Sequence, residues 1–350
     1  MASLASVTPG SSYPGLLKTE NNTGLTGSLQ IVSDGDGNLT PLRISTCFIT
    51  NYGNGGVTTN TAFGSRVLEI NTSGQELSTF GNCALLCNTT GRRNSAFGFN
   101  ALLSTTSGGY NSAFGAVAME KNTTGALNSA VGIGALYANT DGSYNNALGA
   151  LALYRNTSGG HNNAIGLSAL ENNLLGGYNV AIGTQSLCGN TTGTDNVALG
   201  AFSIKSNSLG NRNTAVGSNS LSNTTNSNNS ALGWGSATNT SSGGFNTAIG
   251  TQALFSNSTA SCNTAVGFNS ACANTTGANN SVLGTNAQTG NFSCSVILGA
   301  CATGTANNQF VVGATGAFNA GAVTVESISP THVWAIRING QNYKIPLIPF

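Results

Sequence analysis

Few residues in this 350-residue chain are of types that catalyse reactions. The two histidines are His161 and His332, and the ten acidic residues are scattered singly. Catalysis needs a positioned nucleophile or an acid–base pair, and the sequence has no phosphate-binding loop of the G-x-x-x-x-G-K type. We therefore expect the protein not to be an enzyme and to need no cofactor.

One short segment has the spacing with which a calcium-binding loop begins. Asp34, Asp36 and Asn38 alternate as the first ligands of such a loop do. The position that should supply the bidentate glutamate, eleven residues after Asp34, is Ser45. We interpret the segment as a turn and expect no metal site.

The eight cysteines do not have the paired C-x-x-C spacing of a zinc site. We interpret them as free, buried thiols that replace small residues. The alternative is that Cys294 pairs with Cys301, or Cys262 with Cys272, across neighbouring turns in an oxidising compartment.

Aromatic side chains offer a different chemistry, which is ligand recognition. Tyr110, Tyr144, Tyr178 and Phe245 occupy one position of a repeat, and His161 occupies the same position. Such rings could stack on the sugars of a host-surface glycan or receptor, or they could stack on one another. We favour mutual stacking and keep receptor contact as the alternative; His161 is then a surface repeat residue.

These side chains belong to an internal repeat of about 17 residues, and such a repeat determines the fold before any other feature does. Each unit contains the pattern N-x-A-h-G, in which h is apolar. The first nine intervals between successive key glycines are 17 residues, and the next six are 16, 17, 17, 17, 15 and 14. The key glycines are Gly64, Gly81, Gly98, Gly115, Gly132, Gly149, Gly166, Gly183, Gly200, Gly217, Gly233, Gly250, Gly267, Gly284, Gly299 and Gly313.

Two positions of the repeat are consistently apolar and two are consistently asparagine. The apolar position directly before the key glycine includes Phe97, Phe114, Val131, Leu148, Ile165 and Ile182, and the one four residues after it includes Leu102, Leu136, Leu153 and Leu170. The asparagines four before it include Asn111, Asn128, Asn145 and Asn162, and those seven after it include Asn122, Asn156 and Asn190. Identical amides stacked at one spacing can form hydrogen-bonded ladders.

The repeat predicts an all-β parallel solenoid of about 16 coils, which we expect to be left-handed. Seventeen residues with two recurrent glycines are too few for a helical hairpin repeat, and Gly, Asn and Thr are poor helix formers. All six prolines lie outside the repeats, as expected when every coil donates backbone hydrogen bonds to a ladder. We assign residues 57–315 to the solenoid.

The alanine two residues before the key glycine predicts a thin roll that has no room for a cofactor. A thin roll cannot bury both large apolar columns, so we expect one column to face another chain. The asparagines and their N-T-T-G bends also generate most of the fourteen N-x-S/T sequons. We interpret the sequons as a by-product of the fold, with glycosylation as the alternative.

The two flanks differ from the repeat. Residues 1–56 contain GSLQIVSDGDGNLTPLRISTCFI, which predicts a β-hairpin module that attaches or oligomerises the protein. Residues 316–350 contain VWAIRINGQNYKIPLI, in which Asn339 and Gly340 predict a hairpin turn. We expect this hairpin, with Trp334, to cap the open end of the solenoid.

Composition excludes several partners. Only 6% of residues are charged and the net charge is +1, so we expect neither nucleic acid nor anionic membrane binding. No apolar run approaches 18 residues, so we expect no membrane span. The first ten residues, MASLASVTPG, lack the basic and apolar regions of a secretory signal.

The N-x-A-h-G coil with its asparagine ladders resembles the head repeats of trimeric autotransporter adhesins and related repeats in fibre proteins of phages and large DNA viruses. The resemblance covers roughly residues 57–315, although the 17-residue period exceeds the usual adhesin coil. The segments GSLQIVSDGDGNLTPLRIST and INGQNYKIPLI resemble modules that flank viral fibre repeats. The resemblance implies a left-handed roll that assembles as a homotrimer.

From these features we expect a homotrimeric virion fibre or spike protein that is a stiff spacer and takes part in host attachment. Its partners would be a capsid or tail attachment protein, bound through the N-terminal region, and a host-surface glycan or receptor. The virion surface is the expected location. The alternatives are a trimeric adhesin at an extracellular or cell surface and, third, an ice-binding or carbohydrate-binding solenoid.

Overall fold

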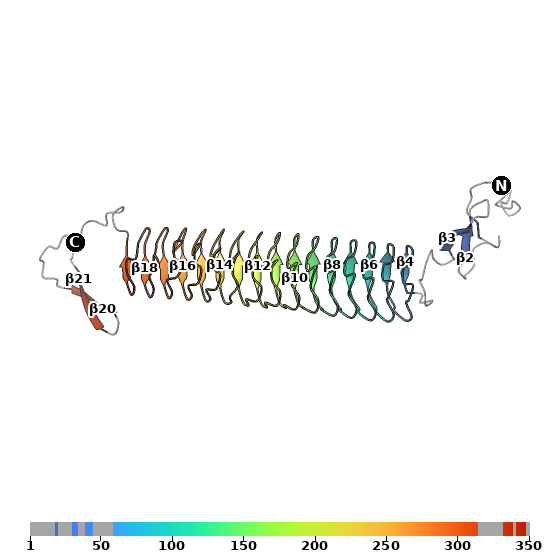
Figure 1. Ribbon diagram of the computed structural model, residues 1–350, viewed down its shortest axis with the longest axis horizontal. Helices are drawn as coiled ribbons and strands as arrows, with labels where there is room; N and C mark the ends of the chain where they lie inside the picture. The colour runs from blue at the N-terminus through green and yellow to red at the C-terminus, as the bar shows by residue number, and fades with distance from the viewer. Residues whose placement is uncertain are drawn as a thin grey trace.

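The computed structural model describes residues 59–313 and, outside them, five strands of the flanks. Residues 59–313 form a straight rod built from one 16-stranded parallel sheet in which the strands follow one another in chain order (Figure 1). No helix occurs within this range. The predicted all-β parallel solenoid with a period of about 17 residues is therefore confirmed.

Each coil contributes one strand of three residues, which ends directly before the key glycine. The strands are β4 Thr61–Phe63, β5 Ser78–Phe80, β6 Ser95–Phe97, β7 Ser112–Phe114, β8 Ser129–Val131, β9 Asn146–Leu148, β10 Asn163–Ile165, β11 Val180–Ile182, β12 Val197–Leu199, β13 Thr214–Val216, β14 Ser230–Leu232, β15 Thr247–Ile249, β16 Thr264–Val266, β17 Ser281–Leu283, β18 Val296–Leu298 and β19 Phe310–Val312.

Neighbouring coils pair in exact repeat register. Ala164 of β10 lies opposite Ala181 of β11 and Ala147 of β9, so equivalent positions stack along the rod. Parallel strands lie about 4.8 Å apart, and fifteen such steps give a rod about 70 Å long. A position of the repeat therefore becomes a straight row of side chains.

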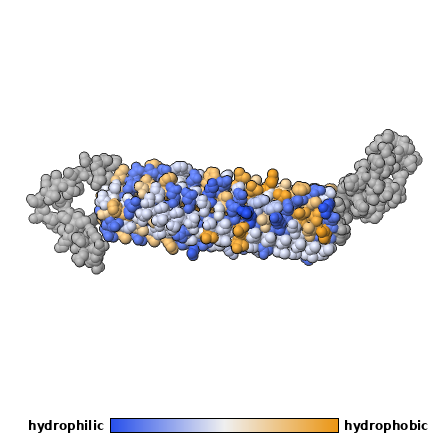
Figure 2. Space-filling view, in the orientation of Figure 1, coloured by the Kyte–Doolittle hydropathy of each residue, from blue (hydrophilic) through white to orange (hydrophobic). Residues whose placement is uncertain are grey.

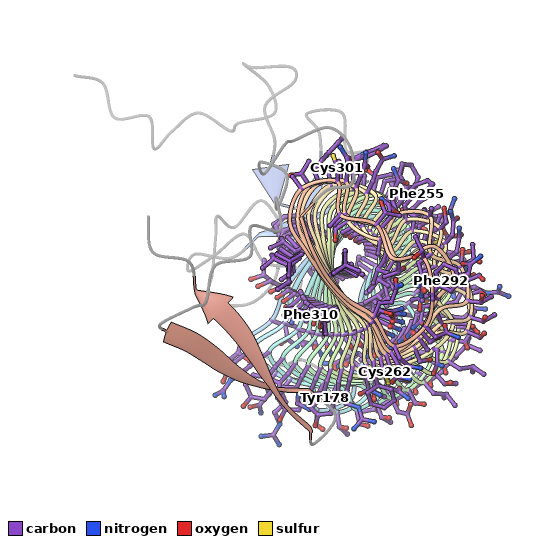
Figure 3. All side chains as sticks on the ribbon, turned by 90° about the vertical axis from the view of Figure 1, so that its left-hand side faces the viewer. Tyr178, Phe255, Cys262, Phe292, Cys301 and Phe310 are labelled. Atoms are coloured by element: carbon purple, nitrogen blue, oxygen red, sulfur yellow. The ribbon has the colours of Figure 1, made fainter. Side chains whose placement is uncertain are left out.

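The coils wind in a left-handed sense, as expected. Figure 3 looks along the rod from its C-terminal end. The labelled residues belong to different coils but mark successive positions of the repeat. In the order of these positions they run clockwise from Cys262 through Phe310, Cys301 and Phe255 to Phe292, while the chain approaches the viewer (Figure 3). A clockwise path towards the viewer is a left-handed coil.

The key glycine is required because successive coils touch there. Gly115 has a φ of +139°, and a Cβ atom added to it would lie 2.5 Å from the carbonyl oxygen of Gly132 in the next coil. Only a residue without Cβ fits this approach. The chain can therefore turn out of each strand only where glycine recurs.

The interior contains one of the two large apolar columns. Leu102, Leu136, Leu153 and Leu170 are fully buried, together with the alanines two residues before the key glycine. The residues directly before the key glycine point outward instead; Leu148, for example, is 50% exposed. Only one of the two columns therefore lies inside, and contact of the other with another chain stays a prediction.

Both asparagine columns are also interior, and they form the predicted ladders. At the position four residues before the key glycine, Asn128 links two coils. Its backbone N–H donates to Asn111 Oδ1 at 3.1 Å, and its Nδ2 donates to the carbonyl oxygen of Gly142 at 2.8 Å. At the other position, Asn156 Nδ2 donates to Asn139 Oδ1 at 2.8 Å. Buried amides are thereby paired along most of the rod. The fully buried ladder residues include Asn111, Asn122, Asn128, Asn145, Asn156, Asn162 and Asn190.

The described strands of the flanks form two antiparallel sheets. β1 (Lys18–Thr19), β2 (Gln30–Ser33) and β3 (Leu39–Ile44) form an antiparallel sheet. β20 (His332–Ile338) pairs antiparallel with β21 (Gln341–Leu347), and Ile338 lies opposite Gln341. The candidate calcium loop at Asp34, the module boundaries, and the turn residues Asn339 and Gly340 lie outside the described residues. Trp334 lies in β20 opposite Ile345, and its role as a cap stays a prediction.

Candidate interaction surfaces

The outward side of the β4–β19 sheet runs along the whole described rod, and we call it the sheet face. It consists of three rows, which lie three residues before, one before and one after each key glycine. The middle row is apolar in every coil and includes Phe97, Phe114, Val131, Leu148, Ile165 and Ile182. Several of its members are strongly exposed: Phe114 at 41%, Ile182 at 40% and Leu283 at 53%.

The outer rows of the sheet face were not singled out by sequence reasoning. The row three before the glycine is mostly Ser or Thr. The row one residue after the key glycine has two stretches in which every second coil holds a large apolar residue. The coils between them hold small residues. The constant position of these two rows relative to the key glycine was the sequence signal that could have revealed them. The large members are Phe99, Ile133, Leu167, Trp234 and Phe268, all exposed.

The sheet face carries no charged residue in any coil of the described rod. All seven Lys or Arg and all six Asp or Glu of residues 59–313 lie on the other sides of the coil, although charged residues would be tolerated on any exposed strand. Depletion of charge at an otherwise exposed apolar surface is typical of the centre of a protein–protein interface. Figure 2 shows polar and apolar surface interspersed along the side of the rod that it presents.

Aromatic rings stack along the N-terminal part of the sheet face. Phe63, Phe80, Phe97 and Phe114 are stacked with ring centroids 4.8–5.0 Å apart. Each ring therefore covers the faces of its neighbours and presents an edge to solvent.

The bend that precedes each strand carries the row in which sequence analysis placed the candidate receptor contacts, five residues before the key glycine. We call it the entry row. His161 lies between Tyr144 and Tyr178, with both ring centroids 4.7 Å away and interplanar angles of 7° and 3°. Mutual stacking thus covers both faces of the His161 ring and one face of each tyrosine ring.

Two other members of the entry row differ from this stack. Arg93 lies over the ring of Tyr110 at 5.2 Å from the centroid and donates a hydrogen bond to its hydroxyl oxygen at 2.6 Å. Phe245 is 65% exposed, and the adjacent coils hold Asn228 and Cys262 at its position. Phe245 and Tyr110 are therefore the entry-row aromatics without a ring neighbour in the adjacent coils, and of these two only Tyr110 is covered by an arginine.

Charged groups pair on the bends. Arg93 also donates to the Glu76 carboxylate, and this hydrogen bond lowers the pKa of Glu76 and raises that of Arg93. Arg66 donates to Glu69 at 2.7 Å, which raises the pKa of Arg66. Both pairs are exposed, so each contributes little to stability.

The seven cysteines of the described rod are free thiols, as expected, but none is fully buried. Cys83, Cys87, Cys188 and Cys272 are half-buried, and Cys262, Cys294 and Cys301 are exposed. Burial raises the pKa of Cys188, and the nearby Glu171 carboxylate adds to this effect. The suggested pairs Cys294–Cys301 and Cys262–Cys272 are not bonded within the chain.

Most described sequons are inaccessible, because their asparagines are ladder residues. Asn88, Asn122 and Asn156 are completely buried. Those with at least partly exposed asparagines all lie in the C-terminal half of the rod. They are Asn223, Asn228, Asn239, Asn279 and Asn291.

Within residues 59–313, no group of three or more His, Cys, Asp and Glu side chains is placed to hold a metal ion. Among the described residues no helix is long and apolar enough to cross a membrane. No family model matches the sequence, and no curated protein matches it. The candidate site is therefore an interaction surface, defined by the sheet face and the bends that flank it.

Proposed function

We propose that this protein is a non-enzymatic structural subunit whose rods associate in parallel through their sheet faces into a homotrimeric fibre or spike. The observation that supports the proposal is the sheet face itself, whose middle row is apolar in every coil and whose three rows carry no charge along the described rod. The core is already complete within one chain, so this surface is not needed to fold a coil.

The size of the sheet face suits a stable assembly. Its three rows span about 13 Å along the strands, and the rod is about 70 Å long. The resulting area, roughly 900 Å² per chain, is close to the ~800 Å² that each partner contributes to a standard interface. A second copy of the chain offers the same 4.8 Å spacing of apolar side chains. Three copies follow from the resemblance to trimeric adhesin heads.

The rod would act as a stiff spacer at the virion surface, with the N-terminal region bound to a capsid or tail attachment protein. Host attachment would use a glycan or receptor contact, for which Phe245 is the best-exposed candidate on the rod. The runner-up function is a trimeric adhesin on a cell surface. Both functions use the same assembled rod.

The threonines of the N-T-T bends argue against the ice-binding alternative. Thr72, Thr123 and Thr157 each donate a hydroxyl hydrogen bond to a backbone carbonyl of the next coil. Hydroxyls committed to the backbone are poorly placed to order water.

The test is the solution mass of the purified chain by light scattering under reducing conditions, with resistance to SDS without boiling as a second readout. We expect a mass of three chains of 35.0 kDa each. A monomer at micromolar concentration would overturn the proposal and would favour the solenoid as a self-sufficient ligand-binding rod.

A further inference from the structure

Two rows of side chains border the sheet face. The entry row lies on the bend before the strand, and the exit row lies two residues after the key glycine, on the bend that follows. Figure 3 shows Cys262 and Tyr178 of the entry row at one edge and Cys301 of the exit row at the other, with Phe310 of the sheet face between them. Residues of both rows have a positive φ.

Only one described coil has cysteine in both rows. Cys294 and Cys301 flank β18, and both are exposed. Their backbone N–H groups donate to Ala278 and Thr285 of the preceding coil at 2.9 and 2.8 Å, so the ladder fixes both positions. A strand of three residues spans about 10 Å, whereas a disulfide needs Cα atoms within about 7 Å. The two thiols therefore cannot bond to each other within one chain.

Symmetry brings these two positions together between chains. When identical rods pack in register around an axis parallel to their length, the entry edge of each chain meets the exit edge of the next. Residues of the same coil then face each other at nearly the same height. We propose that Cys294 of each chain forms a disulfide with the partner's Cys301, which closes the trimer covalently near the C-terminal end of the rod.

The remaining positions of the two rows are compatible with this contact. No two charged residues share a coil across the two rows, so no like charges would meet. The only glycines of the exit row face larger entry-row residues: Gly134 faces Leu127, and Gly235 faces Asn228.

Formation of the bond is a two-electron oxidation. A thiolate of Cys294 or Cys301 attacks a small-molecule disulfide such as oxidised glutathione and releases one glutathione thiol. The facing cysteine then attacks the mixed disulfide, the interchain S–S bond forms, and the second glutathione thiol leaves. Two cysteine protons are transferred and one glutathione disulfide is reduced for each bond.

The inference rests on the proposed parallel trimer, so the test separates the two. The full chain is purified with reductant, its mass is measured, and it is then treated with oxidised glutathione and run on a denaturing gel without reductant. We expect a covalent trimer from the unchanged protein and loss of that band in both Cys294→Ser and Cys301→Ser. Cys262→Ser is the matched control, because Asn269 occupies the exit position of its coil, and we expect it to behave like the unchanged protein.

Mixing the two single variants identifies the pairing. Chains of Cys294→Ser refolded together with chains of Cys301→Ser should give covalent dimers, although neither variant alone does. A reduced trimer that does not cross-link on oxidation would overturn this inference and leave the proposed assembly intact. Cross-links that persist in both single variants would also overturn it, and a monomer would overturn the assembly itself.

Discussion

Asn139 Nδ2 donates a hydrogen bond of 2.8 Å to Asn122 Oδ1, exactly one coil earlier, and both residues are fully buried. Each amide also donates to a glycine carbonyl of its own bend; Asn139, for example, donates to Gly142 at 2.9 Å. The interior is thus held by polar ladders beside a single row of leucines. A break in a ladder leaves a buried group unpaired.

Such a break occurs at Thr105, which replaces asparagine and leaves the buried Asn88 Oδ1 without a partner. We expect Thr105→Asn to restore the ladder and stabilise the protein by about 1 kcal/mol, the value of a net hydrogen bond. Thermal unfolding checks this. The matched control is Asn139→Thr, which should create a new break and lower the unfolding temperature; an unchanged temperature in both variants would contradict the ladder model.

The close approach at the key glycine predicts strong sensitivity to a methyl group. Gly115→Ala should destabilise the rod by more than about 3 kcal/mol, because its Cβ would meet a backbone carbonyl at 2.5 Å and the φ is unfavourable. Gly134→Asn is the control, since Asn100 occupies the same exit-row position with a φ of 54°. Denaturant unfolding should separate the two variants clearly, and equal losses would contradict the assigned role.

A charge placed on the sheet face should separate the chains without unfolding them. We expect Leu148→Glu to give a folded monomer by light scattering, with an unchanged far-UV spectrum, because a buried unpaired carboxylate is costly at an interface. Thr124→Glu introduces the same charge on an exposed bend away from the sheet face and should leave the mass unchanged. If the Leu148→Glu variant is still a trimer by light scattering, the interface between chains lies outside the sheet face.

The Glu76–Arg93 pair predicts a small pH dependence. Since Arg93 lowers the pKa of Glu76 in the folded state, the pair stabilises the fold above the ordinary glutamate pKa of about 4.3 and loses this contribution as the pH falls through the lower, folded value. Unfolding temperatures of the unchanged protein and Glu76→Gln should therefore differ slightly at pH 7 and converge in strong acid. A difference that grows in acid would contradict the assignment.

Buried sequons predict how the chain responds to N-glycosylation during synthesis. Asn122 and Asn156 have no room for a glycan once the coil closes. If the chain is directed into a glycosylating secretory pathway, we expect modified, misfolded protein, and an inhibitor of N-glycosylation should restore the folded rod. Soluble, folded protein that carries glycans at these asparagines, detected by peptide mass spectrometry, would contradict the interior position of the ladder.

The sequence by itself determined the solenoid, its period and its ladders, because each coil repeats the same local contacts and glycine recurs wherever the coils touch. It also indicated that one apolar column must lie outside. Only the tertiary structure decided which one: the coil closes around the leucines four residues after the key glycine and turns Phe97 and its equivalents outward. It alone placed Cys294 and Cys301 at opposite edges of one face, since the spatial relation of two rows depends on how the bends between them fold.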